Sequence, residues 1–213
     1  MCAAHAQTLG RSAMQTGYRR LGLRSAMLVL SAGVCSLRTY FPDDASALPA
    51  LANDFAVARY MSRRFPHPYT SRDAEDWVNT ISRDSAFLTF AIDVDGALAG
   101  GIGFDFEDGE RAGTAQVGYW LGRKFWGRGI ATAALKVLVG YGFENVGLRR
   151  IQAYVMRPNV ASARVLEHAG FVHEATLRGF YLDRDELVQD ALVYAKLSPG
   201  LYVARKGEGV VTA

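Results

Sequence analysis

The 213-residue chain has two cysteines, Cys2 and Cys35, and neither belongs to a Cys-x-x-Cys pair or to a cluster with histidine. Small secreted domains use several cysteines as disulfides, and structural zinc sites need cysteine and histidine at short spacings. The sequence therefore argues against a disulfide scaffold and against a metal site. It also lacks a continuous apolar run of about 18 residues, so no membrane-spanning helix is expected.

Acidic residues are missing from the first 42 positions, which hold five arginines. The net charge of +3 comes from this segment, because the remainder carries 24 − 5 = 19 basic and 21 acidic residues. A main part that is close to neutral offers no general surface for phosphate backbones. We therefore expect no nucleic-acid partner.

The first 25 residues or so are rich in Arg, Ser, Ala and Gly, which is typical of a disordered or loosely attached segment. Two other interpretations stay open. Arg19 and Arg20 precede the apolar run 26–30, as in a targeting peptide, although no small-x-small cleavage site follows. Alternatively, Met27 is the natural start. We divide the chain into an N-terminal extension (1–33), one domain (34–198) and a C-terminal tail (199–213).

The first part of this domain has the pattern of one short strand and two helices. Positions 34–40 favour a strand, and the run 42–44 opens a helix with an aspartate cap. Thr70 or Ser71 caps the second helix, whose acidic first turn suits its positive end. The apolar positions expected on these helices are Leu48, Leu51 and Phe55, then Trp77 and Ile81.

From Phe87 onward the hydrophobic period changes to two, which indicates strands. Strands are predicted over 87–92, 98–106, 115–121, 150–156, from 171 onward and over 187–197, with a tight turn at 95–96. Helices are predicted over about 130–145, ending near Gly147, and over 159–169, ending at Gly170. Half of the chain is hydrophobic, enough for one core of ordinary size. This order predicts a single α/β domain with a mixed, mostly antiparallel sheet and about four flanking helices.

The most informative segment, residues 119–132, joins a strand to a helix through a loop with glycines at 127 and 129. Such a loop leaves backbone N–H groups unpaired at the positive end of the helix. Glycines there let a ligand approach the backbone, which suits a phosphate or pyrophosphate. Arg123, Lys124 and Arg128 add positive charge. A plain turn before a helix is the structural alternative.

Two common nucleotide signatures are missing from this loop. No Gly-Lys-Ser/Thr ends it, so it is not a P-loop. No third glycine stands at the spacing of a dinucleotide fingerprint, and no acidic residue ends a following strand. Further along the chain, Asn159 caps a short helix that follows directly on the next strand, and Gly170 ends it.

Together these segments resemble the GCN5-related N-acetyltransferase (GNAT) superfamily, and within it the branch of ribosomal-protein alanine N-acetyltransferases. The resemblance covers about residues 35–197, in the family's order. The residues that carry it are Leu37-Arg38 with Asp44, Gly118-Tyr119-Trp120-Leu121, Trp126-Gly127-x-Gly129-x-Ala131-Thr132, Asn159-x-x-Ser162 with Glu167 and Gly170-Phe171, and finally Leu177-Arg178, Asp190 and Tyr194.

The resemblance implies a cytoplasmic, metal-independent enzyme that moves acetyl from acetyl-CoA to a primary amine by direct attack in a ternary complex. The amine belongs to a small molecule or to a protein N-terminus. The sheet would splay at the CoA site, with the pantetheine arm in the gap. A homodimer stays open. The implied cofactor-binding residues are Trp120, Leu121, Gly122, Trp126, Gly127, Arg128, Gly129, Ile130, Ala131, Thr132, Asn159 and Ser162.

The resemblance also suggests catalytic residues. Ser162 is the candidate acid or hydrogen-bond donor to the sulfur, against the alternative of a serine that bonds the backbone of its own helical turn. Tyr181 is a second candidate acid, although a core or surface tyrosine is the default. Relatives often carry a glutamate where this chain has Gln116, which cannot accept a proton. A water relay is one alternative, and other candidate bases are Asp105, Glu107, Asp183 and His67.

Gln116 also keeps a second class of function open, namely a non-catalytic acyl-CoA-binding or regulatory domain. A phosphate-binding module for another nucleotide is a third. The aromatic residues Phe65, Tyr69 and Trp77 either shape an acceptor pocket or pack in the core.

Overall fold

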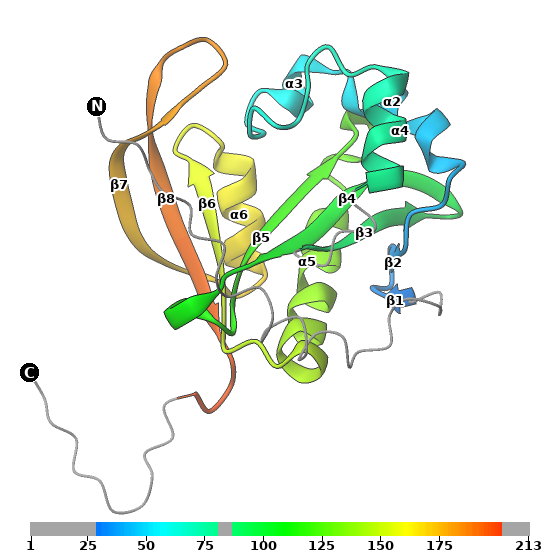
Figure 1. The fold of residues 1–213 in the computed structure, drawn as a ribbon. Coiled ribbons are helices and arrows are strands. Elements are labelled where there is room, and N and C mark those ends of the chain that lie inside the picture. The colour runs from blue at the N-terminus through cyan, green and yellow to red at the C-terminus, as the bar shows by residue number, and fades with distance from the viewer. Residues whose placement is uncertain (1–28, 81–86, 202–213) are drawn as a thin grey trace, which may run out of the picture.

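The structure is a computed structural model, and it describes residues 29–80 and 87–201. These form one eight-stranded sheet in the order β1-β2-β3-β4-β5-β6-β8-β7 (Figure 1). All neighbouring strands are antiparallel except β5 and β6, so the predicted mixed and mostly antiparallel sheet is confirmed. The strands are β1 (Val29–Ser31), β2 (Ser36–Arg38), β3 (Phe87–Val94), β4 (Ala97–Phe106), β5 (Thr114–Leu121), β6 (Arg150–Met156), β7 (Val172–Leu182) and β8 (Val188–Leu197).

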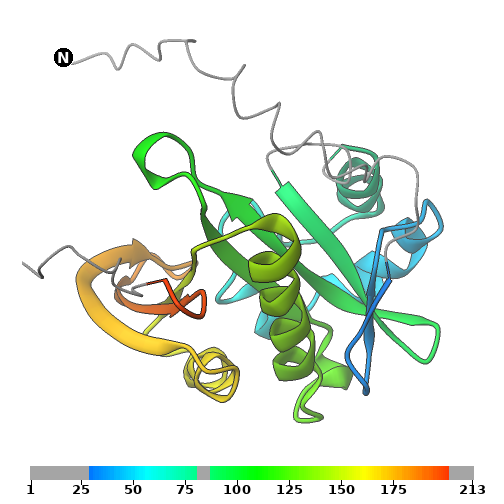
Figure 2. The same ribbon diagram turned by 90° about the horizontal axis from the view of Figure 1, so that it is seen from below.

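Five α-helices cover the two faces of this sheet. The first three lie on one face and the last two on the other (Figures 1 and 2). They are α2 (Asp44–Ala52), α3 (Phe55–Ala58), α4 (Ser71–Thr80), α5 (Ile130–Tyr141) and α6 (Val160–His168). Short turns add η3 (Gly109–Arg111), η4 (Arg123–Phe125) and the π-helical η5 (Gly142–Val146). None of the helices described here is long and apolar enough to cross a membrane.

The long helix α5 holds the centre of the core. Its buried residues Ile130, Ala134, Leu135 and Leu138 recur at helical spacing and face the sheet. The chain then continues through η5 and ends at Gly147, which has a φ of 78°, the left-handed conformation expected of a helix-ending glycine. The helical stretch predicted over 130–145 is therefore confirmed, with its last turn wound as a π-helix.

The single helix predicted from Asp44 past Phe55 is wrong, because the chain forms two helices there. Asp54 caps α3 by accepting a hydrogen bond from the Ala56 N–H at 2.8 Å, and α2 ends at Ala52. Aspartate competes well for backbone N–H groups, which explains the break. The predicted aspartate cap on α2 is also wrong: Asp43 makes no side-chain cap, and Phe55 is exposed.

The second predicted helix begins as expected. The Thr70 hydroxyl accepts from the Asp73 N–H at 3.2 Å, and the Asp73 carboxylate accepts from the Thr70 N–H at 2.7 Å. This reciprocal pair satisfies two of the helix's free donors. Ile81 lies outside the described residues.

The sheet begins earlier than the expected domain boundary at residue 34. Strand β1 pairs with β2, with Val29 opposite Arg38, although it falls in the segment expected to be an extension. The interpretations given for the first 25 residues concern positions outside the described part of the chain, as do those for the tail from residue 202.

Candidate functional site

The sheet parts between β5 and β6. These parallel strands share three register pairs, from Thr114 opposite Arg150 to Gln116 opposite Gln152. On its other edge β5 stays paired with β4 up to Leu121. Within residues 29–80 and 87–201, the segment 117–121 therefore has one edge without a strand partner, and such an edge can pair with another extended chain.

The loop between β5 and α5 lies at the end of this open edge. Gly127 and Gly129 have φ values of 71° and 73°, in the left-handed region that favours glycine. Helix α5 begins directly afterwards, and its first intrahelical bond runs from the Ala133 N–H to the Gly129 carbonyl. The N–H groups of residues 130–132 consequently face outward at the positive end of the helix.

Packing fixes this loop in place. The Trp126 indole N–H donates to the Leu121 carbonyl at 2.8 Å, so the Trp126 side chain holds the loop against the end of β5. Gly122 lies so close to the Leu51 side chain that a Cβ atom would collide with it. The Ile130 side chain is buried in the core, which leaves its backbone for a ligand.

Basic side chains surround the loop. Lys124 and Arg128 lie on the buried Phe125 ring, with their charged groups 5.1 Å and 5.8 Å from its centroid. Arg123 is 4.0 Å from the Asp54 carboxylate and remains largely exposed. Exposed cations beside a helix N-terminus favour an anionic ligand.

The second predicted segment, at the start of α6, approaches β5 from the other side of the gap. The Asn159 side chain accepts from the Ser162 N–H at 3.2 Å, so the predicted N-cap is confirmed. The Ser162 hydroxyl lies 2.9 Å from the Tyr119 hydroxyl, which also donates to the Ser162 carbonyl at 3.2 Å. Burial raises the pKa of Tyr119 to about 12, against a smaller lowering by its hydrogen bond to Ser162.

The contact between the Tyr119 and Ser162 hydroxyls was not predicted from the sequence. Tyr119 belonged to the motif, but no role was predicted for its side chain. Strand alternation was the available signal, since Ala115, Val117, Tyr119 and Leu121 share one face of β5. That face lies toward α5 and α6.

Tyr181 lies away from this pair, on the edge strand β7. Its ring packs edge-on against Phe180 at 5.0 Å, and Phe180 stacks on Tyr154 of β6 at 5.7 Å. Burial raises the pKa of Tyr181. The structure thus places Tyr181 in an aromatic group on the β6–β7 side, and its role as an acid stays a prediction.

Aromatic side chains line the opposite face of β5, toward α2, α3 and α4. Phe65 packs on Trp120 at 5.4 Å and on Tyr69 at 5.2 Å, while Trp77 packs edge-on against Tyr40 at 6.2 Å. The Tyr40 hydroxyl is buried and has no hydrogen-bond partner among the described residues. Tyr69, Trp120 and Tyr40 are buried in the core, and Phe65 and Trp77 are partly buried against it, so the structure shows the core packing that was the alternative for these residues. We call the five aromatic residues the aromatic wall.

The turn between β7 and β8 reaches across to this wall. The Arg184 guanidinium donates to the carbonyls of Ala58 at 2.8 Å and Ser62 at 3.1 Å, and also to the Phe65 carbonyl. Arg63 donates back to the Asp183 carbonyl at 3.0 Å. Figure 1 shows this turn and α3 facing one another. The contacts join segments about 120 residues apart, so nothing local in the sequence could have indicated them.

Two of the four candidate bases, Asp183 and Glu107, are already engaged. The Asp183 carboxylate accepts from two N–H groups of its own turn and from Gln189, and these bonds lower its pKa. Glu107 forms an ion pair with Arg111 at 2.8 Å. His67 is exposed and packs against the Phe55 ring at 5.5 Å.

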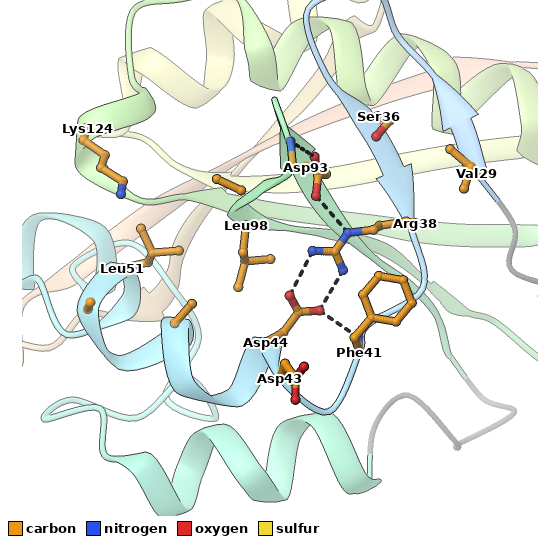
Figure 3. A pocket seen from close by; sticks show the side chains of 14 residues that line it. Val29, Ser36, Arg38, Phe41, Asp43, Asp44, Leu51, Asp93, Leu98 and Lys124 are labelled. Atoms are coloured by element: carbon orange, nitrogen blue, oxygen red, sulfur yellow. Dashed lines mark hydrogen bonds and ion pairs between the residues drawn. The ribbon is translucent and has the colours of Figure 1, made fainter.

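The Arg38 and Asp44 positions of the motif line a concave site of about 790 Å³, which Leu51 and Lys124 border on the side of the loop (Figure 3). Arg38 forms two bonds with the Asp44 carboxylate, at 2.7 and 2.9 Å, and a third with Asp93 at 2.9 Å. Asp44 also accepts from the Phe41 N–H at 2.7 Å. These charges satisfy one another and fasten α2 to β2 and β3. Among the described residues, no group of His, Cys, Asp or Glu side chains could hold a metal ion.

Known proteins share this architecture. Residues 36–172 match the acetyltransferase (GNAT) domain. An uncharacterized N-acetyltransferase, p20 of Bacillus licheniformis, is 33% identical over 156 residues, which cover 72% of this chain and 87% of that protein. A GNAT-family acetyltransferase from Bacillus anthracis has a TM-score of 0.70 and 26% identity, covering 80% of this chain and 98% of that one.

A further solved structure, Mycobacterium smegmatis RimJ in complex with CoA-disulfide, has a TM-score of 0.67 and 27% identity, covering 85% of this chain and 91% of that one. The family resemblance of the sequence motifs is thus confirmed. Parted strands, a glycine loop and a capped second helix occur here in a chain whose relatives are N-acetyltransferases. This chain belongs to the GNAT acetyltransferase family and is an acyltransferase.

Proposed function

We propose that this enzyme transfers the acetyl group of acetyl-CoA to a primary amine. The open edge of β5 carries this proposal, because it ends at the glycine loop and at the free N–H groups of α5. An acyl-CoA has the matching sequence of groups, with a pyrophosphate followed by an extended arm that contains two amides. The RimJ relative was solved with a CoA-disulfide, which supports the same ligand class here.

The donor site divides into two parts. The N–H groups of residues 127–131 would hold the pyrophosphate, with Arg128 and Lys124 beside them and the start of α5 favouring negative charge. The Trp126 N–H, expected to join them, donates to the Arg123 carbonyl at 3.1 Å. The open edge of β5 up to Leu121 would pair with the pantetheine arm, as an added strand does. The Gly122 N–H, expected to take part, donates to the Ala99 carbonyl at 2.9 Å. Acetyl-CoA supplies the acyl group as a thioester. No metal is required for this transfer.

The Ser162 and Tyr119 hydroxyls would serve the leaving group. Amine attack on a thioester expels a thiolate, which needs a proton or a hydrogen-bond donor. Ser162 stands at the start of α6 beside the parted strands, and Tyr119 is 2.9 Å away. We assign Ser162 as the donor to the sulfur and Tyr119 as its partner.

The acceptor would bind on the other face of β5, against Phe65, Tyr69 and Trp120 of the aromatic wall. Of these three, Phe65 is the partly exposed one, and its apolar surface suits an amine carried by an apolar body, either a small molecule or the N-terminus of a protein. The second candidate function is a non-catalytic acyl-CoA-binding domain, favoured by the glutamine at position 116, where relatives often carry a base.

An amine panel tests the proposal. Wild-type protein, acetyl-CoA and a set of amino acids, polyamines, aromatic amines and N-terminal peptides are followed by release of free thiol. We expect turnover with at least one class. Intact CoA binding without turnover on any amine would support the non-catalytic function instead.

Calorimetry tests the donor site separately. We expect binding of CoA but not of ATP or NAD, and loss of CoA binding in Gly127→Trp, whose side chain would fill the loop. Gly109→Trp is the matched control, since Gly109 is an exposed glycine with a positive φ of 58° far from the loop. Wild-type affinity in Gly127→Trp would contradict the assignment of the loop.

A further inference from the structure

Asp105 and Gln116 are neighbours across two strands. In the β4–β5 register Asp105 lies opposite Gln116, Gly103 opposite Gly118, and Gly101 opposite Trp120. Because alternate residues of a strand share a face, Asp105 and Gln116 project on the same side as Trp120. Cβ atoms of such directly opposed residues lie roughly 4.5–5.5 Å apart.

Between these residues and the aromatic wall the paired positions are glycines, although over Gly103 the space is taken by β3, where the Thr89 hydroxyl oxygen lies 3.1 Å from the place of a Cβ atom. Gly103 and Gly118 form the intervening pair. A Cβ atom on Gly118 would meet no atom of the described residues within 4 Å, so the space above it is open. Trp120 and Phe65 bound this space on one side, and Asp105 and Gln116 bound it on the other.

The acyl carbon would arrive at this space. Gln116 is the last residue of β5 that pairs with β6, so the gap proposed for the pantetheine arm ends beside it. The opposite face is filled by α5, α6 and the Tyr119–Ser162 pair. An acceptor amine would therefore approach from the side on which Asp105 projects.

Asp105 is the candidate carboxylate that remains available. Within the described residues, no hydrogen bond or ion pair holds its side chain, whereas Glu107 is paired with Arg111 and Asp183 is bound within its own turn. We propose that Asp105 is the general base of this enzyme, an assignment that rests on the proposed acetyl transfer.

In the proposed transfer two protons leave the acceptor nitrogen and one proton reaches the sulfur. The acceptor ammonium gives one proton to the Asp105 carboxylate, directly or through one water. The neutral nitrogen forms the C–N bond to the acyl carbon while the C–S bond breaks. The nitrogen loses its second proton to water, while the Ser162 hydroxyl gives its proton to the thiolate and is reprotonated from water. The products are the amide, the free thiol and one proton, which Asp105 returns to solvent.

The surroundings of Asp105 suit this role. Asp105 is an exposed residue of β4. Desolvation of its carboxylate nevertheless raises its pKa, the nearby charge of Arg64 lowers it, and that of Glu107 raises it. A carboxylate with a raised pKa is a stronger base. Activity should fall as the pH drops through this pKa, because the protonated carboxyl cannot accept a proton.

Asp105→Asn tests the assignment, with kcat and CoA affinity measured on the full chain. We expect kcat to fall about 10²–10⁴-fold, the usual contribution of a general base, with unchanged CoA affinity and loss of the acid limb of the pH profile. Asp105→Asn/Gln116→Glu places a carboxylate on the neighbouring strand and should recover about tenfold or more of the lost rate. Asp108→Asn, an exposed change three residues away, is the control and should keep wild-type kcat.

Four results would overturn the assignment. The first is a kcat of Asp105→Asn within about twofold of wild type, and the second is an acid limb of the pH profile that persists in that variant. The third is a loss of CoA affinity in Asp105→Asn as large as its loss of rate. The fourth is that adding Gln116→Glu to Asp105→Asn recovers no rate. If wild-type protein binds CoA but acetylates no amine, both this assignment and the proposed function fail. Turnover by wild type with an unaffected Asp105→Asn contradicts this assignment alone.

Discussion

The Tyr119 and Ser162 hydroxyls illustrate how a single contact links two elements of the site. Tyr119 comes from β5 and Ser162 from the first turn of α6, and 43 positions separate them in the chain. Their hydrogen bond crosses the region where β5 and β6 part. A hydroxyl held in this way is oriented before any ligand binds, which is what efficient hydrogen-bond donation requires.

Removing either hydroxyl should affect turnover more than binding. Ser162→Ala is expected to lower kcat by about 10²-fold and Tyr119→Phe by less, with CoA affinity retained, because the thiolate loses its donor or the donor loses its orientation. The double variant should be no worse than Ser162→Ala, since the two groups act as a unit. Steady-state kinetics and calorimetry measure both quantities.

Tyr141→Phe provides the control for these variants. Tyr141 is also a tyrosine with a pKa raised by burial, and its ring packs on Phe90 away from the parted strands. Its kcat should equal that of wild type. Full activity in Ser162→Ala would remove Ser162 from the acid role.

The features predicted correctly from the sequence are those formed by residues close together in the chain. The Asn159 cap, the reciprocal Thr70–Asp73 cap, the Gly147 stop and the Asp95-Gly96 turn all depend on residues within a few positions of one another. The second partner of Arg38 could not be predicted in the same way, because Asp93 lies 55 positions away, whereas Asp44 already stood with Arg38 in the motif.

Elements were predicted more successfully than their arrangement. Alternation placed the strands well, and the helical period of α5 matched its buried face. The sheet order depends on tertiary pairing instead, since β8 inserts between β6 and β7. Likewise, the opening of the sheet after Gln116 was implied only by family resemblance, because alternation is the same in paired and unpaired parts of a strand.

The turn between β7 and β8 is the element whose role is easiest to test. Arg184→Ala removes three hydrogen bonds to carbonyls next to the aromatic wall, so the turn should separate from α3. We expect KM for the amine to rise about tenfold while CoA affinity stays unchanged, because the wall is on the acceptor face and the loop is not. Initial rates at varied amine concentration measure this.

Arg72→Ala is the matched control for this change. Arg72 is exposed in the first turn of α4, and its loss should leave KM unaltered. An equal rise in both variants, or a loss of CoA affinity in Arg184→Ala, would contradict a specific role for the Arg184 contacts.

At the scale of the whole molecule, one layered domain carries both the proposed donor face and the proposed acceptor face. The sheet's central strands β4 and β5 present one face to α5 and the other to the aromatic wall. We propose that the catalytic domain needs the chain from β1 to β8 and none of the residues before Met27. Strand β1 belongs to it because Val29 pairs with Arg38, the residue that fastens α2.

Two truncations separate these segments. A chain that starts at Met27 should keep the thermal midpoint and CoA affinity of the full chain. A chain that starts at Val34 loses β1 and should melt earlier, by about 2–4 °C for each kcal/mol lost. Thermal unfolding followed by circular dichroism measures both. Equal midpoints for the two truncations would show that β1 adds nothing to the domain.

The parting of β5 and β6 has a consequence for stability as well as for binding. In the described part of the chain, three residue pairs between β5 and β6 join the two parts of the sheet, one formed by β1–β5 and the other by β6, β8 and β7. A donor that pairs with the open edge would bind the folded chain alone, and mass action then raises the free energy of unfolding by about 2.7 kcal/mol at a donor concentration of 100 Kd. The free energy of unfolding would thus rise with the concentration of acyl donor. A measurement of the thermal midpoint would then report how much acyl donor is present.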